Sequence, residues 1–182
     1  LNSFYPDKLH ENENIPPIYI TKLIIESADG SMSKTYRSIE EIENLKRVEL
    51  PYDTYNIEFE FTALDLVTPT KNSYRYILEN YDEKWSNADH SNIVNYTSVN
   101  DGEYKFIVVG SNNDGLWNEV GASILLRIET PFWKTWWFIA LLFGAISSLI
   151  AYFVITQIKN MLAVERLRTK LAADLHDNIG SS

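Results

Sequence analysis

The sequence predicts a mostly β fold: an antiparallel immunoglobulin- or fibronectin-like β-sandwich, followed by one transmembrane helix that continues into a cytoplasmic coiled-coil-like helix. Three observations lead to this prediction. Aromatic residues make up 13% of the 182 residues, and they favour strands. Short apolar stretches alternate with a period of two residues between turn signals. A later stretch of 24 residues, Thr135–Ile158, contains no charged residue.

Several short stretches between residues 18 and 129 have the pattern of strands. The clearest is Tyr55–Phe61, where apolar and polar residues alternate, which predicts one buried face and one wet face. About seven short strands at regular spacing indicate a sandwich. Glu40–Lys46 fits either a short helical turn or a charged loop. The other predicted strands are Ile18–Glu26, Tyr74–Glu79, Ile93–Thr97, Tyr104–Val109 and Ser123–Glu129.

Two turn signals separate the later strands. Asn100–Gly102 and Asn113–Gly115 are both Asn-Asp-Gly, which supplies the positive φ angles of a tight hairpin. We therefore expect a hairpin at each of them.

The uncharged stretch Thr135–Ile158 is long enough to span a membrane and contact lipid. Trp133, Trp136 and Trp137 surround its start, as expected at a membrane interface. Residues 1–134 hold 12 basic and 22 acidic residues, whereas the residues after the span hold four basic and three acidic ones. Because basic flanks stay in the cytoplasm, the N-terminal part is expected outside and the C-terminus inside.

The tail after the membrane, residues 159–182, has a coiled-coil seam. Met161, Val164, Leu171 and Leu175 follow one another at steps of three, seven and four residues. The seam is imperfect, because Arg168 and Asn178 also fall on it. It predicts a homodimer through the cytoplasmic helix.

His176 follows the seam directly, and Asp177 follows His176. A carboxylate can accept the Nδ1 hydrogen of an imidazole and leave the Nε2 lone pair free for nucleophilic attack. Taken alone, the pair is more typical of a polar, exposed helix face than of a catalytic site.

Composition argues against several other functions. A net charge of −9 disfavours binding to a nucleic-acid backbone, and the absence of cysteine excludes disulfides and thiolate chemistry. His10 and His90 lack partners at metal-ligand spacing, so no metal site is predicted. Trp85 and Trp117 could stack on a sugar, but we favour packing within the sandwich.

Residues from about 15 to 137 resemble the Y_Y_Y domain, a fibronectin-like sandwich that lies between a periplasmic β-propeller and the transmembrane helix of two-component sensors. The resemblance is carried by tyrosines on successive strands and by an N-D-G-x-W motif. The matching residues are Tyr76, Tyr96, Tyr104, Asn113, Asp114, Gly115 and Trp117.

The string from Arg166 to Ser182 resembles the H box of L-H-D-type sensor histidine kinases, with matches at Leu175, His176, Asp177, Ile179 and Gly180. By this resemblance His176 accepts the γ-phosphate of ATP, and Asp177 is the base and orienting residue. ATP and Mg²⁺ would bind in a catalytic domain that this chain lacks, so the chain alone is expected to be inactive. Many members have Gln where this chain has Ser181, which leaves phosphatase activity toward the response regulator open.

Four segments are therefore expected: the end of a propeller and a linker (1–14), an extracytoplasmic Y_Y_Y sandwich (15–131), a transmembrane helix (135–158) and the start of the phosphoacceptor helix (159–182). The predicted function is signal relay, in the inner (plasma) membrane, from an external sensor to histidine phosphorylation and a response regulator. The external ligand is expected to bind mainly to the preceding domain. The alternative is a non-enzymatic single-pass receptor, or a carbohydrate-binding or adhesion module.

Overall fold

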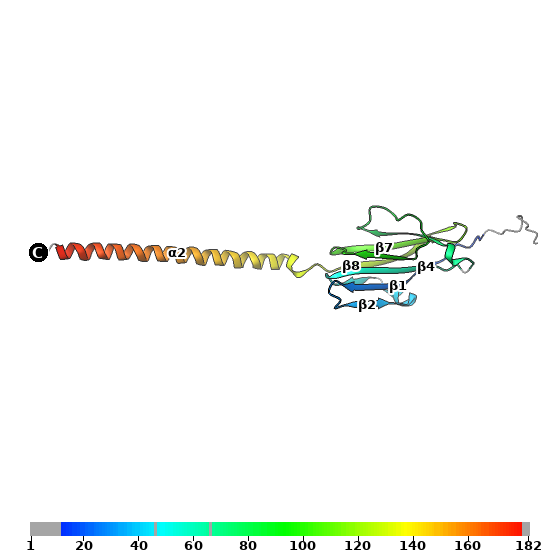
Figure 1. Cartoon of the computed structure of the whole chain (residues 1–182), viewed down its shortest axis with the longest axis horizontal. Helices are drawn as coiled ribbons and strands as arrows, with labels where there is room; N and C mark the ends of the chain where they lie inside the picture. The colour runs from blue at the N-terminus through cyan, green and yellow to red at the C-terminus, as the bar shows by residue number, and fades with distance from the viewer. Residues whose placement is uncertain (1–11, 46, 66, 180–182) are drawn as a thin grey trace, which may run out of the picture. The chain divides into compact units, whose positions relative to one another are not determined.

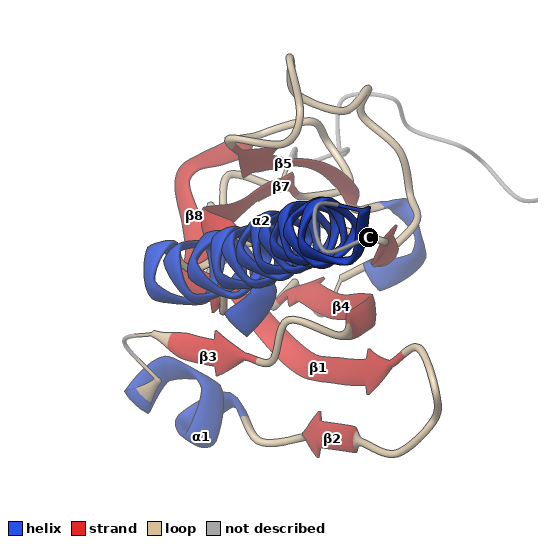
Figure 2. Cartoon of the chain, turned by 90° about the vertical axis from the view of Figure 1, so that its left-hand side faces the viewer, coloured by secondary structure: helices blue, strands red, loops and turns tan. Residues whose placement is uncertain are grey.

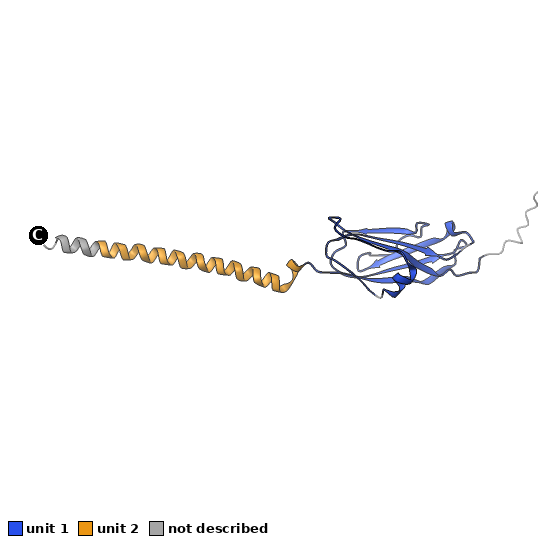
Figure 3. Ribbon diagram, turned by 90° about the horizontal axis from the view of Figure 1, so that it is seen from below, with its two compact units in different colours: residues 1–131 blue, residues 132–182 orange. Residues whose placement is uncertain are grey.

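The chain forms two compact units, Leu1–Pro131 and Phe132–Ser182, which are coloured separately in Figure 3. The computed structural model describes residues 12–179 apart from 46 and 66, and side chains as far as residue 171. The first unit holds all the described strands, and the second holds one long helix (Figure 1).

The first unit is a sandwich of two four-stranded sheets (Figure 2). One sheet has the order β2-β1-β4-β6, with strands Ser33–Tyr36, Ile18–Ser27, Thr54–Ala63 and Ile93–Thr97. The other has the order β3-β8-β7-β5, with strands Val48–Leu50, Trp117–Ile128, Gly102–Ser111 and Ser73–Glu79. The predicted β-sandwich is therefore confirmed.

The second sheet is mixed, whereas the sequence predicts antiparallel strands throughout. Strand β3 pairs in parallel with β8, from Val48 opposite Leu126 to Leu50 opposite Ile128. Neither β3 nor β2 is predicted, because strands of three and four residues are too short to show a period. The pairing is favoured because it buries Val48 and Leu50 at the edge of the core.

The core lies between the sheets, on the faces that the alternation predicts. Ile57, Phe59 and Phe61 of β4 are buried, and the intervening glutamates are only partly so. Phe59 stacks on Phe106 of the opposite sheet, with ring centroids 3.9 Å apart and an interplanar angle of 7°. This pair joins the two sheets at the centre of the domain.

The ambiguous segment after residue 38 is helical. Helix α1 spans Ile39–Asn44, and the Ser38 side chain caps it by accepting a hydrogen bond from the Glu41 N–H. Its Ile42 side chain is buried against the core. Two short 3₁₀ turns, Pro69–Lys71 and Phe132–Lys134, complete the described elements.

Only one of the two predicted hairpins forms. Asn113–Gly115 lies in the hairpin between β7 and β8, where Gly115 has a φ of 82°. The prediction for Asn100–Gly102 is wrong, because β6 and β7 belong to different sheets and the connection crosses the sandwich. Positive φ angles occur at Ser98, at 56°, and at Gly102, at 155°, but not at Asn100 or Asp101.

Helix α2 spans Trp136–Ile179 without a break, so the uncharged stretch and the tail are one helix. Its most apolar window has a mean hydropathy of 2.5, and none of that window is buried within the protein. Among the described helices it alone is long and apolar enough to cross a membrane.

Candidate functional site

The chain enters the sandwich through an extended segment, residues 12–17, which we call the strap. Two asparagines on the β7–β8 side of the domain hold it by its backbone. The side-chain amide of Asn112 donates to the carbonyls of Asn12 and Asn14, the latter at 3.0 Å. The side-chain amide of Asn118 donates to the carbonyl of Pro16 at 2.8 Å. The strap is thus fixed by residues about a hundred positions further along the chain.

Each asparagine also fixes its own part of the hairpin. Oδ1 of Asn112 accepts from the N–H groups of Asp114 at 3.0 Å and Leu116 at 2.9 Å. Oδ1 of Asn118 accepts in the same way from the N–H groups of residues 120 and 121. Because one amide side chain has both an acceptor and two donors, each asparagine joins the strap to the β7–β8 hairpin, Asn112 through the connection before β8 and Asn118 through β8 itself. Asn112 is 1% exposed, and its bonds to the strap are partly buried.

Asn12 of the strap, in turn, donates hydrogen bonds to side chains of the domain. Its backbone N–H donates to Oδ2 of Asp114 at 2.6 Å, and its side-chain amide donates to Asp65 Oδ1 at 3.1 Å and to Asn113 Oδ1 at 2.9 Å. Asp65 is 2% exposed, and none of the described donors reaches its Oδ2. Asn12 therefore links the strap both to the β7–β8 hairpin and to the connection after β4.

The strap lies at one end of the sandwich, which we call the entry end. Here Ile18 of β1 faces Ala63 of β4, and Ser111 of β7 faces Trp117 of β8. The opposite end, the exit end, is where Ile128 of β8 faces Gly102. Strand β8 runs from one end to the other over 12 residues, or roughly 40 Å. Only residues 129–135 separate it from α2.

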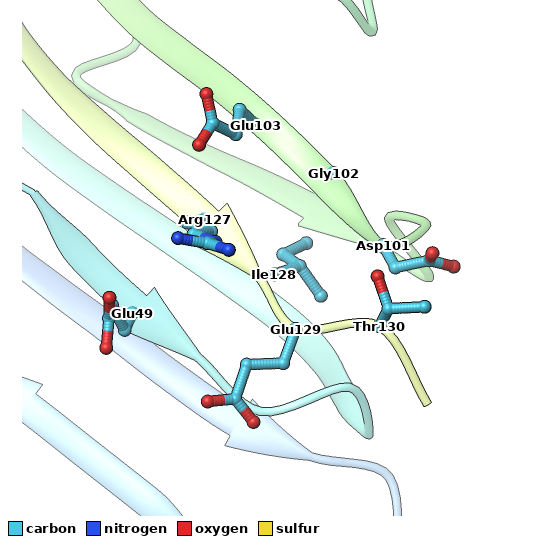
Figure 4. Close-up of a pocket in the computed structure, with 8 residues that line it drawn as sticks. All are labelled: Glu49, Asp101, Gly102, Glu103, Arg127, Ile128, Glu129 and Thr130. Carbon is cyan, nitrogen blue, oxygen red and sulfur yellow. The ribbon is translucent and has the colours of Figure 1, made fainter. Parts of the chain in front are cut away.

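The exit end has a hollow on the outer face of the second sheet (Figure 4). Arg127 of β8 lies between Glu49 of β3 and Glu103 of β7, to which it is opposed in register (Figure 4). Glu103 forms an ion pair with Arg47, at 3.0 Å. Asp101 and Glu129 add further negative charge. The hollow therefore contains opposed charges in solvent, but no nucleophile beside a base.

The signature tyrosines belong to the framework of the sandwich. The Tyr96 hydroxyl donates to Asp82 Oδ2 at 2.8 Å, and burial together with this carboxylate raises the pKa of Tyr96 far above its usual value. The Tyr104 hydroxyl donates to the carbonyl of Asn100 at 3.0 Å. Burial also raises the pKa values of Tyr76 and Tyr104. All three hydroxyls therefore stay neutral, and those of Tyr96 and Tyr104 fix loops, as in the tyrosine corner of other sandwiches.

Trp117, at the start of β8, and Trp85, in a loop, do not form a sugar-binding platform together. The guanidinium of Arg75 lies 4.2 Å from the centre of the Trp117 ring and pairs with Glu119 at 3.2 Å. One face of Trp117 is therefore covered by a cation–π contact. Trp85 is partly exposed and lies in the separate loop between β5 and β6.

The predicted phosphoacceptor site lies at the end of α2. The backbone at His176 and Asp177 is helical, but the side chains of both residues lie outside the described part of the chain, as does His10. His90 is described, and its Nδ1 lies 2.8 Å from the carbonyl of Asn72. Among the described residues, no group of three or more His, Asp or Glu side chains is arranged to hold a metal ion.

The residues that hold the strap are not found by reading the sequence. Asn112 stands next to the Asn-Asp-Gly motif, so it reads as one more turn residue, and Asn118 has no motif around it. Their partners are backbone carbonyls about a hundred residues away, which leave no trace in the local sequence. Only the run of four polar residues, Ser111–Asp114, hints at a further role.

A β-sandwich whose last strand leads, within seven residues, into a helix able to cross a membrane is the arrangement of a membrane-proximal domain in a single-pass membrane protein. Residues 65–129 match the Y_Y_Y domain family. This match includes the tyrosines and the N-D-G-x-W motif on which the predicted resemblance to the Y_Y_Y domain rests.

The chain is also similar to Histidine kinase P4 of Formosa agariphila, with 27% identity over 136 residues, which is 74% of this chain and 10% of that protein. It thus spans about a tenth of the length of this relative. The predicted relationship to sensor histidine kinases of two-component systems is confirmed.

Two solved structures share the fold. They are the extracellular domains of BT3049 and BT4673 from B. thetaiotaomicron, both assigned as hybrid two component systems. Each superposes with a TM-score of 0.52 at 24% identity, over 64% and 68% of this chain respectively and 16% of the solved chain. The sandwich therefore has the fold of these extracellular domains, and the chain spans only about a sixth of their length.

Proposed function

We propose that this chain is the membrane-proximal relay of a two-component sensor histidine kinase. In this proposal the sandwich lies outside the inner membrane, α2 crosses it, and the C-terminal part of α2 is the start of the dimeric phosphoacceptor helix. A conformational bias that arises upstream reaches the cytoplasm through the sandwich. The upstream ligand must bind two states of the receptor with different affinity for this to happen.

The observation that carries the proposal is the continuous connection from the strap to the membrane helix. Asn112 and Asn118 join the incoming chain to the start of β8, and β8 leads to α2 through only seven residues. Strand β8 pairs with β7 from Trp117 to Ile128 and also with β3 at its last three residues, and in this proposal displacement of the strap at the entry end is transmitted along it. The bonds from Asn112 and Asn118 add to those that Asn12 donates and to the Leu64 N–H bond to Pro17, so the strap is held at several points.

The orientation follows from charge. The residues after the uncharged stretch include Lys159, Arg166, Arg168 and Lys170, whereas the sandwich side is strongly acidic. Reporters fused near Ser182 and near Leu1 test this directly: we expect cytoplasmic labelling for the first and external labelling for the second. The reverse pattern would exclude the relay.

Dimerisation is proposed through the seam on α2. Met161, Val164 and Leu171 are each more than half exposed along this helix and repeat at coiled-coil spacing. Cysteines placed at Val164 or Leu171 should cross-link two copies in membranes. A cysteine placed at Glu165, off the seam, is the control, and preferential cross-linking there would show that the seam is misplaced.

The chemistry is proposed for His176, which receives the γ-phosphoryl group of ATP on Nε2 as ADP leaves. Asp177 holds the tautomer and stabilises the positive charge that develops on the ring. ATP and Mg²⁺ are supplied by a catalytic domain outside this chain, and the phosphoryl group then passes to a response regulator. Phosphoryl transfer depends mostly on positioning and electrostatics, so the helix need contribute little more than a fixed, exposed imidazole.

The test uses the full-length sensor in membranes. His176→Gln should abolish the acid-labile phosphoprotein, and Asp177→Asn should slow its formation, while dimer cross-linking at Val164 is unchanged. Residues 1–182 alone should incorporate no phosphate. If His176→Gln is labelled at the normal rate, this helix is not the phosphoacceptor.

The relay itself is tested by Asn112→Asp combined with Asn118→Asp. This double variant should retain basal labelling and lose its response to the external ligand. Asn95→Asp introduces the same type of charge at an exposed position on β6 and should respond normally. A double variant with a full ligand response would show that the strap does not carry the signal.

A further inference from the structure

Exposed aliphatic side chains gather around the strap. Four of them, which we call the entry patch, are Ile15, Leu64, Val67 and Leu116. Val67 is 68% exposed and Ile15 54% exposed. Single exposed apolar residues are normal on protein surfaces, but several at one place mark an interaction site.

Hydrogen bonds place the four residues next to one another. Ile15 belongs to the strap itself, and the Leu64 N–H donates to the carbonyl of Pro17 at 2.9 Å. The Leu116 N–H donates to Asn112, whose amide holds the strap. The Val67 N–H donates to the same Asp65 oxygen that accepts from Asn12 in the strap. Each member of the patch is therefore in the strap or no more than one side chain away from it.

The rest of the sandwich surface differs from this end. Among the described residues of the first unit, the other large exposed aliphatic side chains are Ile93, Leu125 and Val120. Ile93 lies on β6 and Leu125 on β8, in different sheets, so each stands alone. The Val120 N–H donates to the side chain of Asn118, which also holds the strap, so Val120 lies toward the entry end. Among the described residues of the sandwich, exposed aliphatic side chains are thus concentrated where the chain enters the domain.

We propose that the entry patch is the docking surface for the extracytoplasmic domain that precedes the strap in the same polypeptide. This inference rests on the proposed function, because it places that domain on the same side of the membrane as the sandwich. Glu13 and Asp114 border the patch, so the docked surface is apolar at its centre and basic at its margin.

Chain connectivity and the length of the relatives identify the occupant. The chain covers only 16% of the solved extracellular domains that share its fold, so those proteins carry several times more structure outside the membrane. In this chain the exit end leads into α2 within seven residues, which leaves the entry end for such a domain. A domain tethered through residues 1–11 is held near the patch at a local concentration on the order of millimolar.

Docking at this place also has a consequence for the relay. The strap backbone is immobilised by Asn112 and Asn118, and its Ile15 side chain is part of the docked surface. Movement of the preceding domain therefore acts on a fixed segment and not on a loose linker.

The absence of cysteine in this chain allows a direct test by thiol labelling. Val67→Cys is prepared in the 182-residue chain and in the full-length receptor with its other cysteines replaced, and the rate of reaction with a soluble maleimide is measured. We expect fast labelling in the short chain and labelling at least about tenfold slower in the full-length receptor, because burial at an interface blocks the reagent. Ile93→Cys and Leu125→Cys are matched controls and should react equally in both.

Three outcomes would overturn the proposal. Equal labelling of Val67→Cys in the two proteins would show that the patch stays open. Equal protection of Ile93→Cys would show general shielding in place of docking at this end. Protection of Val67→Cys in the short chain that grows with its concentration would identify a second copy as the occupant. The phosphorylation tests of His176 are independent of this readout, so failure of the kinase assignment and failure of the docking surface are distinguishable.

Discussion

Asn112→Asp is the sharpest perturbation of the strap, because the two side chains have the same shape. The acceptor oxygen toward Asp114 and Leu116 is kept, and both donated bonds to the strap are lost. A carboxylate oxygen then faces the carbonyls of Asn12 and Asn14 at a site that is 1% exposed. The substitution therefore acts on the strap and leaves the hairpin in place.

The expected loss of stability in Asn112→Asp follows from the carbonyl groups that lose their hydrogen-bond donors. Each buried carbonyl without a donor costs ~1–3 kcal/mol, and an unpaired buried charge adds to this. In the variant the strap can detach from the domain, and water can then hydrate its carbonyls. The loss of stability therefore cannot exceed the free energy with which the strap binds to the domain. We expect a loss of about 2–4 kcal/mol in the free energy of unfolding at neutral pH. Asn118→Asp exposes one carbonyl, that of Pro16, and should cost about half as much.

The loss of stability caused by Asn112→Asp should be larger at neutral pH than at acidic pH. Burial against two carbonyl oxygens raises the pKa of the introduced carboxyl above the ~3.9 of a free aspartate. The folded state then binds a proton more tightly than the unfolded chain. The difference in the free energy of unfolding between the variant and the parent protein is therefore largest at neutral pH. It becomes smaller as the pH falls through the raised pKa.

The assay is urea unfolding of the 182-residue chain in detergent at several pH values, with hydrogen exchange at the Leu64 amide, which donates to the strap at Pro17. Faster exchange at Leu64 should accompany the loss of stability. Asn95→Asp, on the exposed edge of β6, should unfold like the parent. Parent-like stability of Asn112→Asp with no pH dependence would refute the role given to these hydrogen bonds.

Three further substitutions test the sandwich by the same unfolding assay. Phe59→Asp places a charge against Phe106 in the centre of the core and should abolish folding or cost about 4 kcal/mol or more; normal stability would mean that the buried face of β4 is assigned wrongly. Gly121→Ala should also be severe, because a Cβ would lie 2.1 Å from the Val108 carbonyl oxygen at a φ of +60°, and a neutral result would refute this backbone contact. Tyr96→Phe removes the bond to Asp82 and should cost about 1–2 kcal/mol at neutral pH. Because the pKa of Tyr96 is raised in the folded state, its contribution is complete below about pH 10 and is lost above it, so the variant should lose less stability at alkaline pH than the parent does.

The sequence predicts most of the β-structure because burial on one face leaves a periodic record. Ile57, Phe59 and Phe61 alternate with glutamates, and all three are buried as the pattern indicates. The short strand β3 leaves no such record, since only three residues pair with β8. The Asn-Asp-Gly signal at residue 100 misleads for a related reason: it reports a local preference for turning, and cannot report which sheet the chain turns toward.

Local patterns in the sequence predict the general architecture of this protein. Apolar runs, tyrosine spacing and the uncharged stretch depend on local composition, and they predict a sandwich similar to the Y_Y_Y domain, followed by a helix that can cross a membrane. The residues that tie the incoming chain to the hairpin and to the strand that leads to α2 are seen only in the folded domain. Asn112 and Asn118 bind backbone carbonyls about a hundred residues away, and a carbonyl is present at every position of the chain. A contact to a group that every residue carries cannot be read from the order of side chains, so it becomes visible only when folding brings the two segments together.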